Sequence, residues 1–329
     1  MLNEQQVKYS LKEVKIPSTS QDVSSMIKEI AISGNDITVR LYTPEADEMS
    51  KEFVKNKTIN TLKKLDSEVN VTVEYVEGKP GITNTIGNVI AIMSGKGGVG
   101  KSLVSGLTAV ALRRMGYKVG ILDADITGPS IPKMFGVTER PGGNDKGINP
   151  VETKTGIKIM SINLLLPNEE DAVIWRGPLI ARAITQFWEE VYWGELDYLV
   201  VDLPPGTADA PLTVLQTIPV SGIIIVFTPQ DLTAMIVKKA VKMAQQMQKP
   251  ILGIVENMSY LYVEEIDKKI ELFGKSQGDA MAKAAGAPLL GQIPIDPALA
   301  KLIDAGSIEN YEIDIIKTIG ESIKKSTGG

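Results

Sequence analysis

The residues with the clearest chemical potential lie in one short loop. Residues 94–102 read SGKGGVGKS, directly after the apolar run 89–93 and directly before a helical pattern of apolar residues that begins at Leu103. This is the G-x-x-x-x-G-K-S spacing of a phosphate-binding loop between a strand and a helix. Its glycines let backbone N–H groups turn inward around phosphate oxygens, and the helix N-terminus adds partial positive charge. The predicted nucleotide-binding residues are Gly95, Lys96, Gly97, Gly98, Val99, Gly100, Lys101 and Ser102.

The loop carries two lysines, and each needs a separate explanation. Lys101 is expected to reach the β and γ phosphates, and the Ser102 hydroxyl to ligate Mg²⁺. Lys96 is not needed for the loop itself. In this respect the loop resembles the deviant Walker A loop of the MinD/ParA-type ATPases, in which such a lysine crosses a dimer interface to the partner's nucleotide. The resemblance implies a homodimer with ATP buried between the protomers and a catalytic role for Lys96.

Carboxylates follow two other apolar runs. Residues 119–122 lead into Asp123 and Asp125, and residues 198–201 lead into Asp202. At the carboxyl ends of parallel strands beside a phosphate loop, carboxylates can hold Mg²⁺ through its waters and orient an attacking water. We predict Asp202 as the Walker B acid, with catalytic and metal-binding roles, Asp123 as a metal ligand, and Asp125 as the catalytic residue that positions water. The division of roles between Asp123 and Asp125 stays open.

The composition excludes several other chemistries. The 329 residues include no cysteine and no histidine, which rules out disulfides, zinc fingers, histidine-based nucleophile activation and iron-sulfur clusters ligated by the chain's own thiolates. With 35 basic and 40 acidic residues, general capture of nucleic acid or anionic membrane is not expected. Apolar runs such as 223–227 are far shorter than the ~20 residues that cross a bilayer, so we expect a cytoplasmic protein.

The elements that must position these residues form an α/β pattern over residues 88–329. Short, nearly continuous apolar runs alternate with helix-length segments, which is typical of strands buried on both faces of a parallel sheet. The predicted strands are 89–93, 119–122, 157–162, 198–201, 223–227, 251–255 and 289–293. The predicted helices are 101–115, 178–192, 232–247, 276–285 and 311–324.

Residues 1–78 have a different pattern and are predicted to form a small α+β domain. Alternating apolar residues at 30–32 and 37–41 flank the turn 33–36, which indicates a hairpin. A helical pattern covers 48–65 and a last alternating strand covers 71–75. The glycine- and proline-containing stretch 79–87 is the predicted linker. The fold class is therefore a parallel-sheet P-loop NTPase domain preceded by a small α+β domain.

One family combines these motifs in this order. The chain contains GKGGVGKS, LDADITGPSIPKMFG, WRGPLI, DYLVVDLPPGTAD, TPQDLTA, ENMSY and GQIPID. Over nearly its whole length it resembles the Mrp/ApbC iron-sulfur cluster carrier ATPases, and its N-terminal part is similar to the MIP18-like domain of some members. The resemblance implies ATP hydrolysis and contacts of Asn257 and Pro294 with the nucleotide base. It also implies that Asp209 belongs to a moving segment.

The chain departs from this family where the cluster ligands are expected. Family members carry a C-x-x-C pair after NMSY, and counting from the flanking matches places Val263 and Ile266 at those positions. A family cysteine in the N-terminal module falls on Ala46. Valine and isoleucine cannot ligate iron. An iron-sulfur cluster is therefore expected from the family but not from this chain, and the acidic run 264–267 is better explained as a solvated hairpin.

Three functions remain open. The chain could serve iron-sulfur assembly without holding a cluster alone, with client or assembly proteins as partners. It could instead be a cluster-free, ATP-dependent switch that binds proteins through its N-terminal module and the face 263–266. The weakest alternative is a MinD- or ParA-like positioning ATPase on membrane or DNA. A membrane version needs an amphipathic basic tail. The isoleucines of the tail 313–323 are instead predicted to pack on their own domain.

Overall fold

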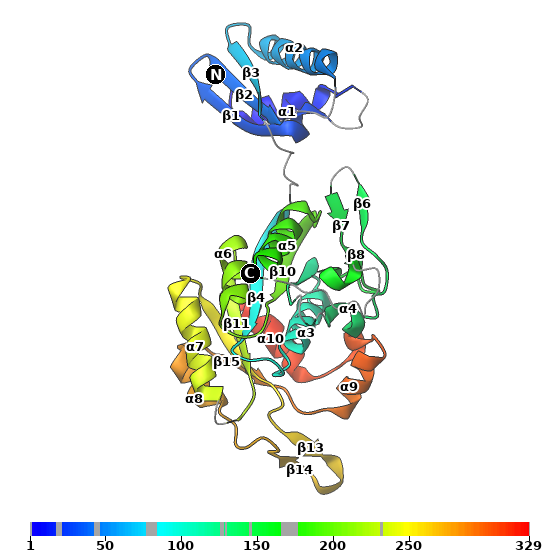
Figure 1. The fold of residues 1–329 in the computed structure, drawn as a ribbon, viewed down its shortest axis with the longest axis vertical. Helices are drawn as coiled ribbons and strands as arrows, with labels where there is room; N and C mark the ends of the chain where they lie inside the picture. Colours follow the sequence, from blue (N-terminus) through cyan, green and yellow to red (C-terminus); the bar gives the residue numbers. More distant parts are fainter. Residues whose placement is uncertain are drawn as a thin grey trace. The chain divides into compact units, whose positions relative to one another are not determined.

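The computed structural model describes residues 2–17, 22–42, 47–76, 84–125, 128, 130–144, 147–165, 177–230 and 233–328. The chain divides into two compact units, Met1–Gly81 and Ile82–Gly329 (Figure 1). The first strand of the second unit begins at Thr85, inside the predicted linker 79–87. Residues 79–83 of that linker and Ala46 lie outside the described residues, as do Trp175, Arg176 and Asp231 of the family strings.

The first unit is a three-stranded sheet covered by helices. Its strands are β1 (Ile27–Ser33), β2 (Asp36–Tyr42) and β3 (Asn70–Val76), in the order β1-β2-β3. β1 and β2 form the predicted antiparallel hairpin, while β3 runs parallel to β2 after helix α2 (Glu48–Leu65). A short helix, α1 (Glu4–Ser10), precedes them and starts with a capping box at Asn3. Buried residues such as Leu11, Val39 and Leu62 form a separate core.

The second unit contains an eight-stranded sheet in the order β15-β12-β11-β4-β10-β5-β9-β8. All neighbouring strands are parallel except β8 and β9, which are antiparallel. The strands are β4 (Thr85–Ser94), β5 (Val119–Asp123), β8 (Val151–Glu152), β9 (Lys158–Ser161), β10 (Glu195–Asp202), β11 (Gly222–Phe227), β12 (Ile251–Glu256) and β15 (Leu289–Gln292). All the strands predicted in this unit are confirmed.

Helices cover both faces of this sheet, as expected for buried parallel strands (Figure 1). On one face lie α5 (Gly177–Glu190), α6 (Asp209–Thr217), α7 (Thr233–Gln246) and α8 (Gly278–Ala285). On the other lie α3 (Lys101–Arg114), α4 (Ile131–Met134), α9 (Pro297–Asp304) and α10 (Asp314–Ser326). β4 shows the alternation: Ala91 and Met93 face the first group, and Ile90 and Ile92 face the second.

The C-terminal helix packs on its own unit, as the sequence predicts. Ile316, Ile319 and Ile323 of α10 are at most 2% exposed and join the core under α3. None of the helices that the structure describes is both long and apolar enough to cross a bilayer.

Two small antiparallel hairpins complete the unit. One is β6 (Gly142–Asn144) with β7 (Gly147–Asn149), and the other is β13 (Leu261–Val263) with β14 (Lys268–Ile270). The second confirms the predicted hairpin around the acidic run, with Glu264 and Glu265 exposed in its turn.

Candidate functional site

The phosphate loop connects the central strand β4 to α3. Gly98 and Gly100 have φ values of +78° and +82°, a left-handed conformation that glycine adopts without strain. At Gly100 a side chain is also excluded sterically, because a Cβ there would lie 2.0 Å from Asn257 Nδ2. The loop start is tied to the segment after β10, since the Gly206 N–H donates to the Ser94 carbonyl oxygen at 3.0 Å.

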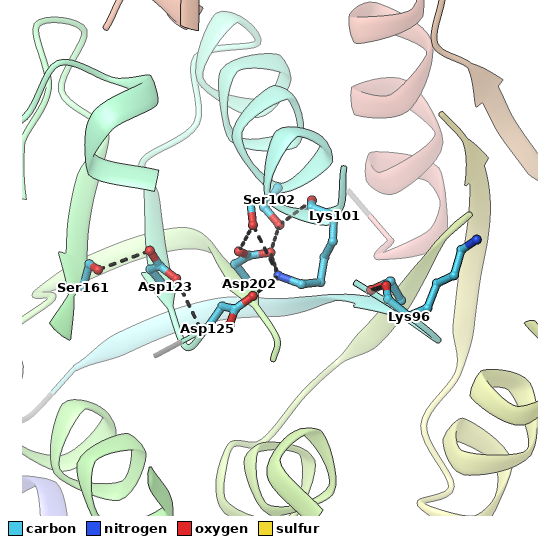
Figure 2. A network of polar contacts seen from close by, with 9 residues as sticks. Lys96, Lys101, Ser102, Asp123, Asp125, Ser161 and Asp202 are labelled. Carbon is cyan, nitrogen blue, oxygen red and sulfur yellow. Dashed lines mark hydrogen bonds and ion pairs between the residues drawn. The ribbon is translucent and has the colours of Figure 1, made fainter. Parts of the chain in front are cut away.

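A buried polar cluster lies beneath this loop, centred on Asp202 (Figure 2). Lys101 Nζ is 2.7 Å from Asp202 Oδ1, and the Ser102 hydroxyl donates to Oδ2 at 2.5 Å. Ser105, one turn further along α3, donates to Oδ1 at 2.7 Å. Lys101 is 5% exposed and Asp202 0%, so all three donors from α3 act on a carboxylate shielded from water. Hydrogen bonds to a charged group are strong, so they fix the side chains of Lys101 and Asp202.

The two other predicted carboxylates lie in the same cluster. β5 and β10 are neighbours, with Asp123 directly opposite Asp202 in the register. Asp125 Oδ2 lies 3.4 Å from Lys101 Nζ, and the backbone N–H of Asp125 donates to Asp123 Oδ1 at 3.2 Å. The Ser161 hydroxyl at the end of β9 donates to Asp123 Oδ2 at 3.2 Å. The sequence-predicted carboxylates are thus brought together around Lys101.

The electrostatics of this cluster follow from the burial of three carboxylates with one ammonium. Burial raises the pKa of Asp123 well above its usual range, and the nearby charges of Asp202 and Asp125 raise it further. The charge of Lys101 and the hydrogen bond from Ser161 lower the pKa of Asp123, but by less than burial and the carboxylates raise it. The raised pKa of Asp123 thus reflects chiefly its burial and, after that, the neighbouring carboxylates, whose negative charge a bound cation would offset.

The donor set fits a magnesium ion. The Ser102 hydroxyl and the Asp202 and Asp123 carboxylates offer the hard oxygen ligands that Mg²⁺ prefers. Among the described residues, no group of three acidic side chains is arranged to hold a metal unaided. Mg²⁺ usually keeps several waters and binds through one or two protein groups plus substrate phosphates.

Lys96 lies apart from this cluster. Its side chain extends away from Lys101 (Figure 2), and its Nζ donates to Gln230 Oε1 at 2.6 Å. The two loop lysines therefore have different surroundings: Lys101 is 5% exposed and ion-paired, whereas Lys96 holds an exposed hydrogen bond to the residues after β11.

The residues predicted near the base lie at the ends of β12 and β15. Asn257, 1% exposed, donates from Nδ2 to the Val99 carbonyl oxygen at 2.9 Å and so supports the phosphate loop. Pro294 is partly exposed after β15, and Asp209 is exposed at the start of α6. Contact of Asn257 or Pro294 with a base, and movement of the Asp209 segment, remain predictions.

Comparison with known proteins identifies the family. Residues 85–325 match the model of the NUBPL iron-transfer P-loop NTPases. The chain belongs to this family. An iron-sulfur cluster carrier protein from Clostridium perfringens is 47% identical over 69% of this chain and 82% of its own length. The carrier protein of the same name from Aquifex aeolicus is 38% identical over 87% of this chain and 86% of its own length.

Solved structures agree with this assignment. A nucleotide-binding protein from Archaeoglobus fulgidus, solved in complex with ADP, has 48% identity and a TM-score of 0.64, covering 70% of this chain and 91% of that chain. The cell division ATPase MinD from Pyrococcus furiosus, at 23% identity and a TM-score of 0.53, shares the fold and covers 73% of this chain. The predicted resemblance to iron-sulfur carriers and to the MinD/ParA fold is confirmed.

The family is named for iron transfer, but the side chains at positions 263 and 266 of this chain are apolar. Val263 ends β13, and Ile266 lies in the turn that follows with 55% of its surface exposed. Neither can ligate iron, and the chain contains no cysteine elsewhere.

Several polar residues of the site were not predicted from the sequence. Ser105 carries a local signal, because it follows Lys101 by four residues and thus lies on the same face of α3. Ser161 ends β9, but the strand predicted there, 157–162, continues past it, so the sequence does not place Ser161 at a strand end as it does Asp123 and Asp202. Gln230 gives no such signal, since its contact with Lys96 spans 134 residues.

Proposed function

We propose that the protein is a Mg-ATP-binding and ATP-hydrolysing homodimeric switch that assists iron-sulfur cluster assembly or transfer. The observation that carries this proposal is the cluster of Lys101, Ser102, Ser105 and Asp202 under a complete phosphate loop, which also carries a second lysine, Lys96, directed away from the cluster. The ADP complex of the A. fulgidus relative and the names of the carrier relatives support the nucleotide and the process.

Phosphate capture would use the loop amides and Lys101. The ammonium of Lys101 exchanges part of its contact with Asp202 and Asp125 for oxygens of the β and γ phosphates. This exchange leaves the Asp202 carboxylate and the Ser102 hydroxyl available to hold Mg²⁺. When bound, Mg²⁺ neutralises developing charge on the phosphate oxygens.

Hydrolysis needs a group that orients water for in-line attack on the γ phosphate. Asp125 is our candidate, because it is only 7% exposed, lies 3.4 Å from Lys101, and is fixed through its backbone N–H to Asp123. Its carboxylate accepts a hydrogen bond from the attacking water. Asp123, which accepts the hydrogen bond from the Asp125 N–H, would serve chiefly to hold Asp125 and the ion in place.

Lys96 would complete the site from the other protomer. It leaves Gln230 and reaches the partner's phosphates when two copies close, so that hydrolysis depends on dimerisation. Lys96→Ala should retain ATP affinity but lose at least about 10-fold in turnover, by analogy with cationic groups that act on the transition state. Lys301→Ala, which removes an exposed lysine of α9, is the matched control and should turn over normally. Unchanged turnover in Lys96→Ala would remove the dimer mechanism.

Lys101→Ala separates binding from turnover. Loss of a buried ammonium that contacts the phosphates should weaken ATP binding at least about 100-fold, measured by titration calorimetry. Because this change also leaves Asp202 and Asp125 without their cation, circular dichroism must first establish that the variant is folded. A folded variant with normal affinity would contradict the assignment of the phosphate site.

An iron-sulfur cluster carried as cargo would need ligands from another protein, because this chain contains no cysteine thiolate. Anaerobic reconstitution of the purified chain followed by iron counting should give no stable cluster. A stable cluster on the isolated chain would overturn the proposal that its ligands come from a partner protein.

The absence of cysteine also favours a second candidate, a cluster-free and ATP-dependent regulator that binds client proteins. Affinity capture with and without a non-hydrolysable ATP analogue distinguishes the two. Nucleotide-dependent retention of iron-sulfur assembly proteins supports the first function, and retention of unrelated clients supports the second.

A further inference from the structure

The two oxygens of the Asp202 carboxylate have different partners. Oδ2 accepts a hydrogen bond from the Ser102 hydroxyl at 2.5 Å. Oδ1 accepts two donors from α3, the Lys101 ammonium at 2.7 Å and the Ser105 hydroxyl at 2.7 Å. Because Asp202 is 0% exposed, bulk water does not reach either oxygen. The proposed phosphate capture therefore changes the surroundings of Oδ1, since it draws Lys101 toward the nucleotide.

Ser105 is the donor that stays on Oδ1 when Lys101 turns to the phosphates. Its short side chain is 0% exposed, whereas the ammonium of Lys101 lies at the end of a long and flexible stem. The Ser105 hydroxyl also lies 3.2 Å from the Lys101 carbonyl oxygen, the usual acceptor for a serine one turn further along a helix. A hydroxyl has a single proton, and the carboxylate is both the closer and the stronger acceptor. Ser105 therefore donates to Asp202.

Both partners of this hydrogen bond belong to packed elements. Ser105 lies in the stretch 104–112 of α3, in which every residue is buried. Asp202 ends β10, where it lies between Ile92 of β4 and Asp123 of β5. The hydrogen bond thus ties the helix that follows the phosphate loop to the strand that supplies the carboxylate. Sites built on helices and strands hold their geometry more precisely than sites on loops.

A second buried hydroxyl on the same helix provides a contrast. Thr108 lies three residues after Ser105 and is also 0% exposed. Its Oγ1 has no hydrogen-bond partner among the residues that the structure describes. Of these two enclosed hydroxyls, it is Ser105 that reaches a charged group. The contact with Asp202 is therefore specific to position 105, and Thr108 offers a matched control for it.

We propose that Ser105 is a positioning residue for magnesium binding and hydrolysis. Its hydroxyl holds Oδ1 of Asp202 while Lys101 contacts the phosphates, which keeps Oδ2 directed toward Ser102 and the ion. This inference rests on the proposed Mg-ATP switch and deepens it. Without the Ser105 hydroxyl, a buried carboxylate oxygen loses its remaining donor from α3 at the step when Lys101 leaves. Removing such an outer hydrogen bond typically weakens metal binding or activity about 10- to 100-fold.

The first test measures how strongly Mg²⁺ tightens nucleotide binding. Titration calorimetry of a non-hydrolysable ATP analogue into the full chain, with and without Mg²⁺, gives two dissociation constants, and we call their ratio the magnesium effect. Ser105→Ala should reduce the magnesium effect about tenfold, with the larger change in the constant measured with Mg²⁺. Thr108→Val removes the hydroxyl that has no partner among the described residues and should leave the magnesium effect unchanged.

The second test separates positioning from nucleotide capture. At saturating Mg²⁺, Ser105→Ala should lower kcat about tenfold and leave KM for ATP within about twofold, because the loop amides and Lys101 are retained. In the Asp202→Asn background the same substitution should lower kcat by no more than about a further twofold, since the two residues act as a unit. A full additional loss in that background would show that Ser105 acts independently of Asp202 and would overturn the inference.

A purely structural role for Ser105 predicts a different result. In the nucleotide-free chain, Oδ1 keeps its contact with Lys101 after the serine hydroxyl is removed. The midpoint of thermal unfolding of nucleotide-free Ser105→Ala should therefore lie within about 4 °C of the unmodified chain. A larger fall in this midpoint, together with an unchanged magnesium effect, would mean that Ser105 supports the fold alone.

The outcomes also separate this inference from the proposed function. If Asp202→Asn abolishes the magnesium effect and Ser105→Ala retains it, the role of Ser105 is overturned and the proposed function stands. If Mg²⁺ does not tighten nucleotide binding even in the unmodified chain, the proposed magnesium site and the role of Ser105 are both overturned. A reduced magnesium effect in Ser105→Ala, with a normal one in Thr108→Val, supports the inference.

Discussion

The polar cluster around Asp202 and the segment 260–275, which contains β13 and β14 and which we name the arm, use their side chains in opposite ways. In the cluster, three carboxylates are buried with a single ammonium, with Lys101 at 5% and Asp202 at 0% exposure. In the arm, apolar side chains such as Ile266 and Leu272 are each 55% exposed. Burying unpaired charge and exposing clustered apolar surface are both unfavourable. Each region therefore indicates an additional component: phosphate and a cation for the cluster, and a protein surface for the arm.

The largest expected effect tests the cluster at its centre. Asp202→Asn removes the charge that pairs with Lys101 at 2.7 Å and weakens the acceptor of Ser102 and Ser105. ATP hydrolysis should fall at least about 100-fold, and its dependence on Mg²⁺ should flatten, because a preorganised charge is lost from a buried site. Steady-state phosphate release across a Mg²⁺ series measures both. Glu195→Gln, on the same strand but in an exposed pair with Lys118, should behave normally. Normal Mg²⁺ dependence in Asp202→Asn would refute the Walker B assignment.

A smaller effect is expected where the phosphate loop packs against Asn257, which follows β12. Gly100→Ala strains a residue with φ of +82° and brings a Cβ to 2.0 Å from Asn257 Nδ2. We expect nucleotide affinity to weaken about tenfold, equivalent to about 1.4 kcal/mol. Adding Asn257→Ala should recover part of this loss, since it removes the clash and leaves only the backbone strain.

The glycine comparison has an internal control. Gly116→Ala has a similar φ of +91° but no heavy atom within 4 Å of its new Cβ. It should lower stability modestly and leave nucleotide affinity unchanged. Equal affinity losses at Gly100 and Gly116 would mean that contact with Asn257 plays no part.

Glu256, 0% exposed at the end of β12, anchors the arm by accepting hydrogen bonds from residues that flank it on both sides, and this anchor should contribute to stability. Glu256→Leu leaves Ser259, Ser276, Gln277 and Gln292 without their buried acceptor. We expect the free energy of unfolding, measured in urea, to fall by about 1–3 kcal/mol, the usual cost of leaving buried donors unsatisfied. Glu264→Leu, at an exposed position of the arm, provides the comparison and should change stability little. Equal stability in the two variants would mean that Glu256 does not anchor the arm.

The smallest effect belongs to the arm's apolar tip. Ile266→Ser should change the unfolding free energy of the monomer by no more than about 0.5 kcal/mol, because the side chain is 55% exposed. Ile225 in β11 is 0% exposed, and Ile225→Ala should lower the free energy of unfolding by about 2–5 kcal/mol under the same conditions. A comparable loss for Ile266→Ser would show that the arm is part of the core rather than an interaction surface.

The two regions also differ in how far the sequence predicts them. The loop motif and the strand-ending aspartates are local patterns, so Lys101, Asp123, Asp125 and Asp202 could be placed before the structure was known. The buried strands and the helices α3, α5, α7, α8 and α10 were predicted from apolar periodicity for the same reason.

Other features depend on signals that are short or non-local. α6 has only nine residues and carries Pro211 in its first turn, which interrupts the helical pattern. α9 was missed although Asp296 and Pro297 are a recognisable start signal, with the Asp296 side chain accepting from the Ala298 N–H. The anchoring of the arm by Glu256 joins residues up to 21 positions apart and could not be read from local spacing.

Titration calorimetry of Mg-ATP into the purified full chain is the decisive experiment for the phosphate site. We expect one nucleotide bound per chain, with binding lost in Lys101→Ala and retained in Lys96→Ala. Absence of any adenine-nucleotide binding in the presence of magnesium would contradict it.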